Sequence, residues 1–354
     1  MKKKFSKINR PSWIFQRPRK LKKFWLDKNE NTHPQLINLY QKILKRINPV
    51  FISTYPELGS LYKKISKYEN VSTENIIFGH GSDGCIKNIF EAFTQKSQKI
   101  LSLSPTFAMY DIYPKIFQLK HSKFDYSFSK KGPNLDLKKL LKKIRNEKPK
   151  LLCIANPNSP TGTALEIADL IKLTKACYKV KCNFLIDEAY YGFYEKTSKI
   201  LIKKYKNVFI IRSLSKAWGL AGLRLGYIIS NKENIKILNK IRPMYEINTF
   251  GTEFLKLLLS RKYLNKLDFI LKDMKNAKNI FYKFLKRKKI EHFLSNGNFV
   301  HFKIKAKNRK KIIYNLSNIS YFRNSENHKC LKNYSRITLT STKNINKIIK
   351  TMEK

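Results

Sequence analysis

Residues 213–227, SLSKAWGLAGLRLGY, decide the fold class of this chain. They lie between two short apolar runs, residues 208–211 and 227–229, each too short for a core helix and typical of a strand buried on both faces. Lys216 follows the first run and is flanked by hydroxyl groups and small residues. This setting suits an amine that is partly desolvated so that it can react with a carbonyl. The alternative is an ordinary surface lysine in a glycine-rich turn.

Similar apolar runs recur along the chain, separated by stretches with helical periodicity. The further strand candidates are residues 75–78, 100–103, 151–155 and 184–186, and the helix candidates include residues 85–93, 137–144 and 164–177. Such alternation predicts an α/β domain with a mostly parallel sheet, here over residues 46–245. Functional side chains are then expected in the loops that follow the carboxyl ends of the strands.

Beyond residue 243 the pattern changes to long helical stretches followed by short strand candidates. The helical stretches are residues 252–264 and 267–286, and the strand candidates are residues 299–304 and 336–339. We expect a second, smaller α+β domain over residues 246–354. Residues 1–45 are expected to form an N-terminal arm that packs on this small domain.

The chain of 354 residues is strongly basic, with 74 Lys and Arg against 24 Asp and Glu and a formal net charge of +50. Its 42% hydrophobic content suffices for a large core and excludes a disordered chain. A basic face can bind nucleic acid, but the lysines are scattered over nearly every segment, which favours solvated lysines on all faces. Without zinc-finger spacing or an RNA-recognition aromatic pair, no nucleic-acid partner is expected.

The cysteines and the N-terminus indicate the compartment. The five cysteines are an odd number without a CxxC pair, so we expect no disulfide scaffold, no metal site and a reducing, cytoplasmic location. The apolar residues 13–15 are interrupted at once by residues 16–19, QRPR, so no signal peptide is expected. No stretch approaches the roughly 18 apolar residues of a membrane span, and no membrane partner is expected.

Residues 79–84, GHGSDG, follow a strand candidate and precede a helix candidate. They match a dinucleotide-binding glycine pattern, but no acidic residue stands at the end of the next strand to hold a ribose hydroxyl. We therefore expect a phosphate site, in which the backbone amides of Gly81, Ser82 and Asp83 hold the anion at a helix N-terminus. Ser213, Ser215 and Arg224 supply further donors for a phosphate.

Two more loops carry polar side chains after buried strands. Residues 156–162, NPNSPTG, form a rigid turn that suits either a functional loop or a plain strand-to-helix connection. In residues 184–190, FLIDEAY, Asp187 ends an apolar strand. An ionised carboxylate there is costly unless a cation or hydrogen-bond donors meet it. The alternative is an aspartate that caps the following helix.

Taken in order, the segments GSD, SPTFAMY, NPNSPTG, DEAY, SLSKAWGLAGLRLGY and SRIT resemble the fold-type-I pyridoxal-5′-phosphate enzymes of aminotransferase class I/II. The resemblance is strongest to their histidinol-phosphate aminotransferase branch and extends from Trp25 to the C-terminus. It implies a homodimeric aminotransferase with a pyridoxal phosphate cofactor, a small-molecule amino donor and a 2-oxo acid acceptor. The alternative is a decarboxylase similar to threonine-phosphate decarboxylase, which shares these cofactor motifs.

The resemblance also implies roles around the cofactor ring. Lys216 would bind the cofactor covalently and later move the substrate proton, and Asp187 would pair with the pyridinium nitrogen. Phe107 would stack on the ring, and Tyr190 would hydrogen-bond its 3′-oxygen. Ser159 stands where the family usually has an asparagine that also bonds this oxygen.

The remaining implied roles concern the cofactor phosphate and the substrate. The groups expected around the phosphate are Ser82, Asp83, Ser213, Ser215 and Arg224, with Tyr55 reaching in from a second subunit. Arg336 matches the family's substrate-carboxylate arginine, and a bidentate arginine is what a carboxylate needs. Arg323 and Asn31 are expected on the substrate side. The segments around these last two depart from the family pattern: residues 26–33 lose the usual prolines, and residues 323–332 are longer and more polar.

Overall fold

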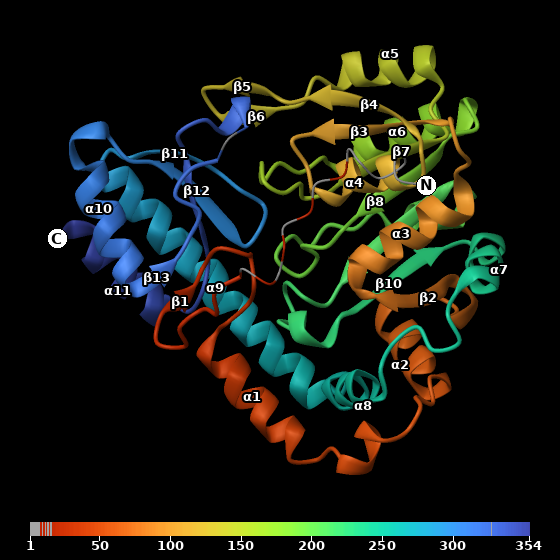
Figure 1. The fold of residues 1–354 in the computed structure, drawn as a ribbon, viewed down its shortest axis with the longest axis horizontal. Helices are drawn as coiled ribbons and strands as arrows, with labels where there is room; N and C mark the ends of the chain where they lie inside the picture. The colour runs from red at the N-terminus through yellow and green to blue at the C-terminus, as the bar shows by residue number, and fades with distance from the viewer. Residues whose placement is uncertain (1–7, 9, 11, 13, 15, 327) are drawn as a thin grey trace.

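The computed structural model describes residues 8, 10, 12, 14, 16–326 and 328–354. Its centre is a seven-stranded sheet (Figure 1) in which β10 alone runs antiparallel to its neighbours and the other pairs are parallel. In sheet order the strands are β2 (Ile76–His80), β10 (Leu225–Ser230), β9 (Val208–Ser213), β8 (Asn183–Asp187), β7 (Leu151–Ala155), β3 (Lys99–Ser104) and β4 (Lys120–Asp125). The prediction of an α/β fold with a mostly parallel sheet is confirmed.

Helices cover both faces of this sheet, which explains why its inner strands are apolar throughout. Successive residues alternate between two hydrophobic clusters: Val208 and Ile210 belong to one, Phe209 and Ile211 to the other. One face is covered by α3 (Gly81–Phe93), α4 (Met109–Ile116) and α7 (Lys232–Ile241). The other is covered by α2 (Gly59–Glu69), α5 (Leu137–Glu147), α6 (Ile167–Lys179) and α8 (Thr249–Leu258).

The structure differs from the sequence expectation at two elements. Strand β4 was not expected, because it lies at the sheet edge and its residues alternate between exposed and half-buried positions, so it has no continuous apolar run. The helix expected over residues 252–264 is wrong. It is broken after Leu258, and Ser260 precedes a new helix, α9 (Arg261–Arg287), that continues to the end of the second expected stretch.

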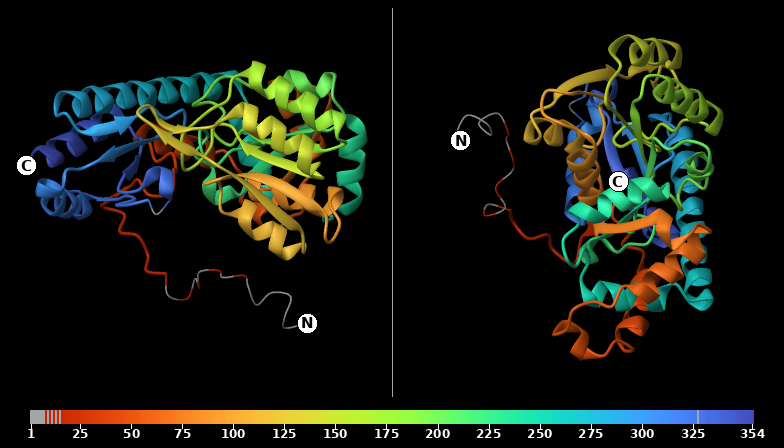
Figure 2. Two further views of the ribbon diagram at one scale, coloured as in Figure 1. Left: turned by 90° about the horizontal axis from the view of Figure 1, so that it is seen from above. Right: turned by 90° about the vertical axis from the view of Figure 1, so that its right-hand side faces the viewer.

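The C-terminal part of the chain forms a smaller antiparallel sheet, in the order β11 (Glu291–Phe293), β12 (Phe299–Lys303) and β14 (Ser335–Thr338). Helices α9, α10 (Ala306–Ile319) and α11 (Thr342–Glu353) accompany it, and α9 extends from this part toward the large sheet (Figure 2). Two short strands, β5 (Ser127–Ser129) and β6 (Gly132–Asn134), form a separate hairpin.

The N-terminal segment contacts the C-terminal elements. Strand β1 (Phe24–Trp25) pairs in parallel with β13 (Ser320–Tyr321), and α1 (Pro34–Leu44) packs against α8 and α9. The division into an arm, a large domain and a small domain at residues 45 and 245 stays a prediction. The apolar run considered as a leader lies largely outside the described residues, because positions 13 and 15 are not among them. No helix in the described part of the chain is long and apolar enough to cross a membrane.

Candidate active site

The site residues predicted on the large sheet lie where its parallel strands end. Asp187 is the last residue of β8, Ser213 is the last of β9, and Lys216 follows in the next loop. Helix α3 begins at Gly81, directly after β2. Because β2, β8 and β9 run in the same direction, these ends meet at one edge of the sheet, as expected for an α/β site.

Two glycines allow possible phosphate ligands to lie close together at this edge, in an arrangement that we call the cradle. A Cβ atom at Gly226 would lie 2.4 Å from the backbone nitrogen of Ser82, and Gly226 is paired with Ser213 across the sheet. A Cβ atom at Gly81, whose φ is +71°, would lie 2.9 Å from a terminal nitrogen of Arg224. Side-chain atoms at either glycine would therefore displace the groups that face the cradle. Amides at a helix N-terminus, hydroxyls and a guanidinium together suit a phosphate.

Ser215 and Asp83 border the same cradle in different ways. The backbone N–H of Ser215 donates to Ser213 Oγ at 3.3 Å, which closes the turn after β9. The carboxylate of Asp83 accepts a hydrogen bond from the Tyr113 hydroxyl at 2.7 Å. A carboxylate repels a phosphate, so Asp83 suits an anion through its backbone N–H and not through its side chain.

Asp187 is buried, and the structure gives it hydrogen-bond donors. The Tyr110 hydroxyl donates to Oδ2 at 3.1 Å and the Ala189 backbone N–H donates to Oδ1 at 3.0 Å. Burial nevertheless raises the pKa of Asp187 to about 6, against the lowering effect of these two donors. The carboxylate therefore still lacks a cationic partner, which a protonated pyridine ring would provide.

Lys216 has the properties of an amine that can react. Its Nζ donates to the backbone carbonyl of Lys28 at 2.9 Å. Burial lowers its pKa to about 8, helped by Arg336 and Arg224 and opposed chiefly by Glu30. Near neutral pH the neutral, nucleophilic amine is therefore far more abundant than for an ordinary exposed lysine.

Tyr190 is held by the N-terminal segment. Asn29 Nδ2 donates to its hydroxyl at 2.7 Å. Burial raises the pKa of Tyr190, while hydrogen bonds from Ser159 and Asn29 oppose this shift, so Ser159 lies within reach of the same hydroxyl. Asn158 cannot replace the usual asparagine without losing contacts, because its Nδ2 already donates to the Pro105 carbonyl at 2.9 Å and contacts the Thr161 hydroxyl at 2.8 Å.

The two predicted substrate-side arginines are neighbours across β14. Arg336 and Arg323 exchange both backbone hydrogen bonds, at 2.8 and 3.0 Å. The Arg336 side chain is largely buried, and its guanidinium lies 5.3 Å from the ring centre of Phe299. The ring of Phe299 in turn contacts Tyr190, with 5.6 Å between ring centres. The structure therefore brings Arg336 to the site, whereas Arg323 is exposed and donates from Nε to the Asp27 carbonyl at 3.2 Å.

The other three predicted residues lie in different surroundings. Asn31 is buried, and its Nδ2 donates to the Ala217 carbonyl at 2.9 Å, so this amide already holds the N-terminal segment against the residue next to Lys216. Phe107 is 39% exposed and contacts Tyr110 edge to face. Tyr55 is 76% exposed and stacks on Tyr245, so it does not reach the site of its own subunit.

A buried ionic network lies beside the site. Arg212, next to Ser213, pairs with Glu188 and, at 3.2 Å, with Glu69, while the Tyr227 hydroxyl donates to Glu69 at 2.7 Å. Buried charges are tolerated only when they are fully paired and hydrogen-bonded. The network thus fixes the ends of β8 and β9 relative to α2, and with them the backbone that carries Asp187.

Sequence reasoning left three contacting residues without a role. Tyr110 belongs to the motif SPTFAMY and bonds Asp187, and Asn29 belongs to NEN and bonds Tyr190. Glu326 forms an ion pair with Arg336. Each lies in a segment that the sequence already marked. The partners of Tyr110 and Asn29 come from distant parts of the chain, and that of Glu326 depends on how a nearby segment folds back, so spacing along the chain indicates none of these contacts.

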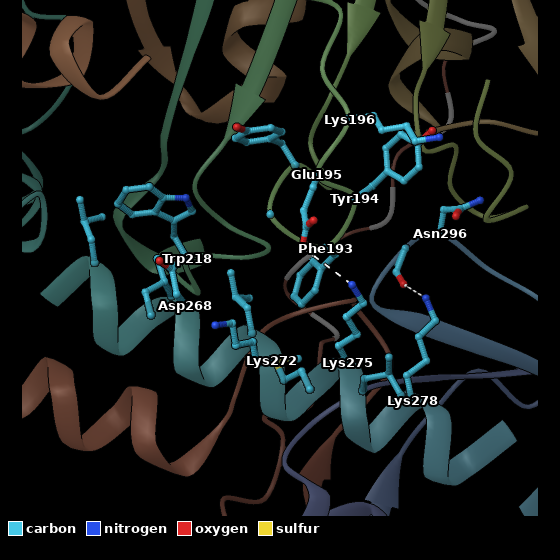
Figure 3. A pocket seen from close by; sticks show the side chains of 18 of the residues that line it. Phe193, Tyr194, Glu195, Lys196, Trp218, Asp268, Lys272, Lys275, Lys278 and Asn296 are labelled. Atoms are coloured by element: carbon cyan, nitrogen blue, oxygen red, sulfur yellow. Dashed lines mark hydrogen bonds and ion pairs between the residues drawn. The ribbon is translucent and has the colours of Figure 1, made fainter. Parts of the chain in front are cut away.

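A pocket of about 1360 Å³ lies beside this site, between the loop after β8 and helix α9 (Figure 3). Its lining includes Tyr191, Lys275 and Lys278. Lys278 donates to the carbonyls of Ser295 and Gly297. None of the predicted cofactor or substrate residues is among the described residues that line it, so this pocket is separate from the cradle and Lys216.

A family model described as aminotransferase class I and II matches residues 22–352. The chain belongs to this aminotransferase family. It is 34% identical over 278 residues to the histidinol-phosphate aminotransferase of Clostridium novyi (strain NT), with 77% of this chain and 74% of the relative covered. It is a pyridoxal phosphate-dependent aminotransferase, as the sequence motifs predicted.

Solved structures share the fold of this aminotransferase. Histidinol-phosphate aminotransferase from Sinorhizobium meliloti, in complex with pyridoxal 5′-phosphate, has a TM-score of 0.79 at 18% identity and covers 93% of this chain and 89% of its own. L-threonine-O-3-phosphate decarboxylase from Porphyromonas gingivalis has a TM-score of 0.75 at 21% identity, and the match covers 93% of this chain and 98% of the decarboxylase chain. At such identities both likenesses concern the fold alone. The decarboxylase alternative has less support than the aminotransferase, because the relatives reported above 30% identity over most of the chain are aminotransferases.

Pyridoxal phosphate is the cofactor of this aminotransferase, and the residues present fit it at three places. The absence of a Cβ atom at Gly81 and Gly226 lets the Arg224 guanidinium and the backbone of β10 approach the N-terminus of α3, which groups donors that suit a phosphate. Asp187 is a buried carboxylate that lacks a cation, and Lys216 is an amine with a lowered pKa. The cofactor's phosphate suits the cradle, its protonated ring nitrogen suits Asp187, and its aldehyde suits Lys216.

Proposed function

We propose that this enzyme exchanges an amino group between an amino-alcohol phosphate of the histidinol phosphate type and a 2-oxo acid. The observation that carries the proposal is the convergence of Lys216, Asp187 and the cradle at Arg224 on one sheet edge, with Arg336 on the substrate side. The substrate type is supported by the names of relatives that match most of the chain.

In this proposal each group near the ring has one task. The bound cofactor acts as an electron sink that stabilises negative charge at the substrate Cα. Asp187 would keep the ring nitrogen protonated, and Lys216 Nζ would accept the proton from the substrate Cα and return it to C4′ of the cofactor. Tyr190 and Ser159 donate to the 3′-oxygen, and Phe107 stacks on the ring. Tyr110 and Ala189 hold the Asp187 carboxylate in place.

The proposal divides the remaining groups between the phosphate and the substrate. Five residues would hold the cofactor phosphate: Ser82 and Asp83 through backbone amides, and Ser213, Ser215 and Arg224 through side chains. Arg336 would bind the acid group of the substrate, with Arg323 nearer the entrance. Asn31 would shape the substrate side by holding the N-terminal segment against Ala217.

A donor screen tests the proposed reaction. The purified enzyme, loaded with pyridoxal phosphate, is mixed separately with histidinol phosphate, L-glutamate or L-threonine phosphate, each time without an acceptor. We expect the visible band of the loaded enzyme to disappear with the first two and to return when 2-oxoglutarate is added. Release of carbon dioxide from threonine phosphate, without amino transfer, would contradict the proposal and favour the decarboxylase.

We also propose that the enzyme is a homodimer in which Tyr55 of one subunit contacts the cofactor phosphate of the other. The exposure of Tyr55 on its own subunit supports this arrangement. The buried, unpaired thiols of all five cysteines support a reducing, cytoplasmic location.

The dimer proposal predicts an effect of Tyr55→Phe on cofactor affinity. Sedimentation should give twice the 41.8 kDa mass of the chain for both the wild type and the variant. The variant should bind pyridoxal phosphate roughly tenfold more weakly, because one hydrogen bond to a charged group is lost. Tyr245→Phe, on the stacked neighbour, serves as the matched control and should leave the affinity unchanged. A monomeric wild type, or equal affinity of Tyr55→Phe and wild type, would contradict the proposal.

A further inference from the structure

Arg336 already has an anionic partner within its own subunit. Its Nε lies 3.3 Å from Oε1 of Glu326, and the two side chains are only 9% and 11% exposed. This carboxylate oxygen is buried and makes no hydrogen bond of good geometry among the described residues. The contact is therefore an ion pair in a poorly solvated place, where charge interactions are strong, and not a bond that orients the guanidinium.

Arg336 is held in place without Glu326. It lies in strand β14, and its backbone is paired with His301 on one side and Arg323 on the other. Its guanidinium also rests over the ring of Phe299. The described structure gives its terminal nitrogens no hydrogen bond, so the fork that suits a bidentate acid group is open.

Glu326 is likewise fixed independently of Arg336. Its backbone N–H donates to the Tyr334 carbonyl at 3.0 Å, and its backbone forms an isolated β-bridge with that of Lys332. Its position is thus set by the segment of residues 323–332, which is longer and more polar than the family pattern. Backbone contacts of its own therefore place this carboxylate beside the arginine.

Apart from Lys216, whose pKa Arg336 helps to lower and which would hold the cofactor, the nearby groups are neutral, paired or exposed. His301 is paired with Arg336 across the sheet, and burial together with Arg336 lowers the pKa of His301 well below its usual range, so the ring is neutral. Asp27 faces Arg19, with which it forms an ion pair at 3.0 Å. Arg323 is exposed and screened by solvent. Arg336 and Glu326 together therefore leave the buried acid-binding position with a net charge close to zero.

We propose that Glu326 is an internal counter-ion that weakens the binding of anionic groups to Arg336 and so sets the affinity for substrate. The inference rests on the proposed function only in taking Arg336 as the site of the substrate's acid group. An enzyme that alternates between a donor and an acceptor must release both. A counter-ion next to the acid-binding arginine keeps either from being held too tightly.

The test is the affinity of 2-oxoglutarate for the enzyme loaded with pyridoxal phosphate, measured by calorimetry. No transfer occurs in this mixture, because neither compound carries an amino group. Glu326→Gln, which keeps the size of the side chain and removes its charge, should bind 2-oxoglutarate about tenfold more tightly than the wild type. In turnover, KM for 2-oxoglutarate should fall by a similar factor without a gain in kcat.

Two controls separate this effect from others. Glu291→Gln removes an exposed carboxylate from β11 and should leave the affinity unchanged. In an Arg336→Gln background, Glu326→Gln should no longer tighten binding. If Glu326→Gln binds 2-oxoglutarate as tightly as the wild type or more weakly, the proposal is overturned and Glu326 is a residue that positions Arg336. The proposal is also overturned if the wild type does not bind 2-oxoglutarate. Failure of the donor screen with histidinol phosphate alone would refute the proposed substrate and leave this inference standing.

Discussion

Replacing Lys216 with alanine should lower kcat for amino transfer on the order of 10⁴-fold or more, because the nucleophile and the proton carrier are lost together. Arg224 and the amides of α3 remain in the variant, so it should still bind pyridoxal phosphate, although more weakly. Borohydride reduction of the loaded wild type, followed by peptide mapping, should place the label on Lys216 alone.

Lys278 provides an internal control for this experiment. Burial lowers its pKa to about 8, the same value as for Lys216, but it lies on α9 and donates to the carbonyls before β12. Lys278 should carry no label, because it has the low pKa but lies beside neither the cradle nor Asp187. A label on Lys278, or on any lysine other than Lys216, would contradict the assignment.

Replacing Asp187 with asparagine should have opposite effects on activity and on the stability of the cofactor-free protein. Activity should fall on the order of 10²- to 10³-fold, since the ring nitrogen loses the charge that keeps it protonated. The pKa of Asp187 is raised from 3.8 to about 6 in the folded protein, which corresponds to about 3 kcal/mol. The folded state holds this proton more tightly than the unfolded chain. Ionised Asp187 therefore destabilises the fold, increasingly from about pH 4 to pH 6 and fully above that.

Thermal unfolding of the cofactor-free proteins checks this prediction. At pH 8 the variant should have the higher Tm, by several degrees, and the difference should vanish toward pH 4. Addition of pyridoxal phosphate should reverse the order, because only the wild type then has a cation beside its carboxylate. A variant with a lower Tm at pH 8 would show that Asp187 is already neutralised within the protein.

Much of the site could be predicted from the sequence because its main groups stand at the ends of short apolar strands. Asp187 ends one run that has to be buried and Lys216 follows another, and parallel strands bring such ends together. Arg224 precedes the antiparallel strand β10, which begins at the same edge. The edge strand β4 was missed for the same physical reason, since a half-exposed strand has no continuous apolar run.

Contacts between distant segments could not be predicted in this way. Asn29 bonds Tyr190 across 161 residues and Tyr110 bonds Asp187 across 77, and nothing in the spacing along the chain specifies such pairs. The ion pair of Arg336 with Glu326 is close in sequence, but it depends on how residues 323–326 fold back onto residues 334–336.

The sequence by itself determined the α/β class and predicted the phosphate cradle and the reactive lysine, because these depend on apolar runs, glycines and polar residues that are adjacent along the chain. Only the tertiary structure decided the environment of each group. It showed that Asp187 is buried without a cation, that Asn158 is already bonded and that Arg336 has an internal counter-ion. Burial and charge pairing arise from segments that meet only when the chain is folded, and they set the pKa values and affinities on which the chemistry depends.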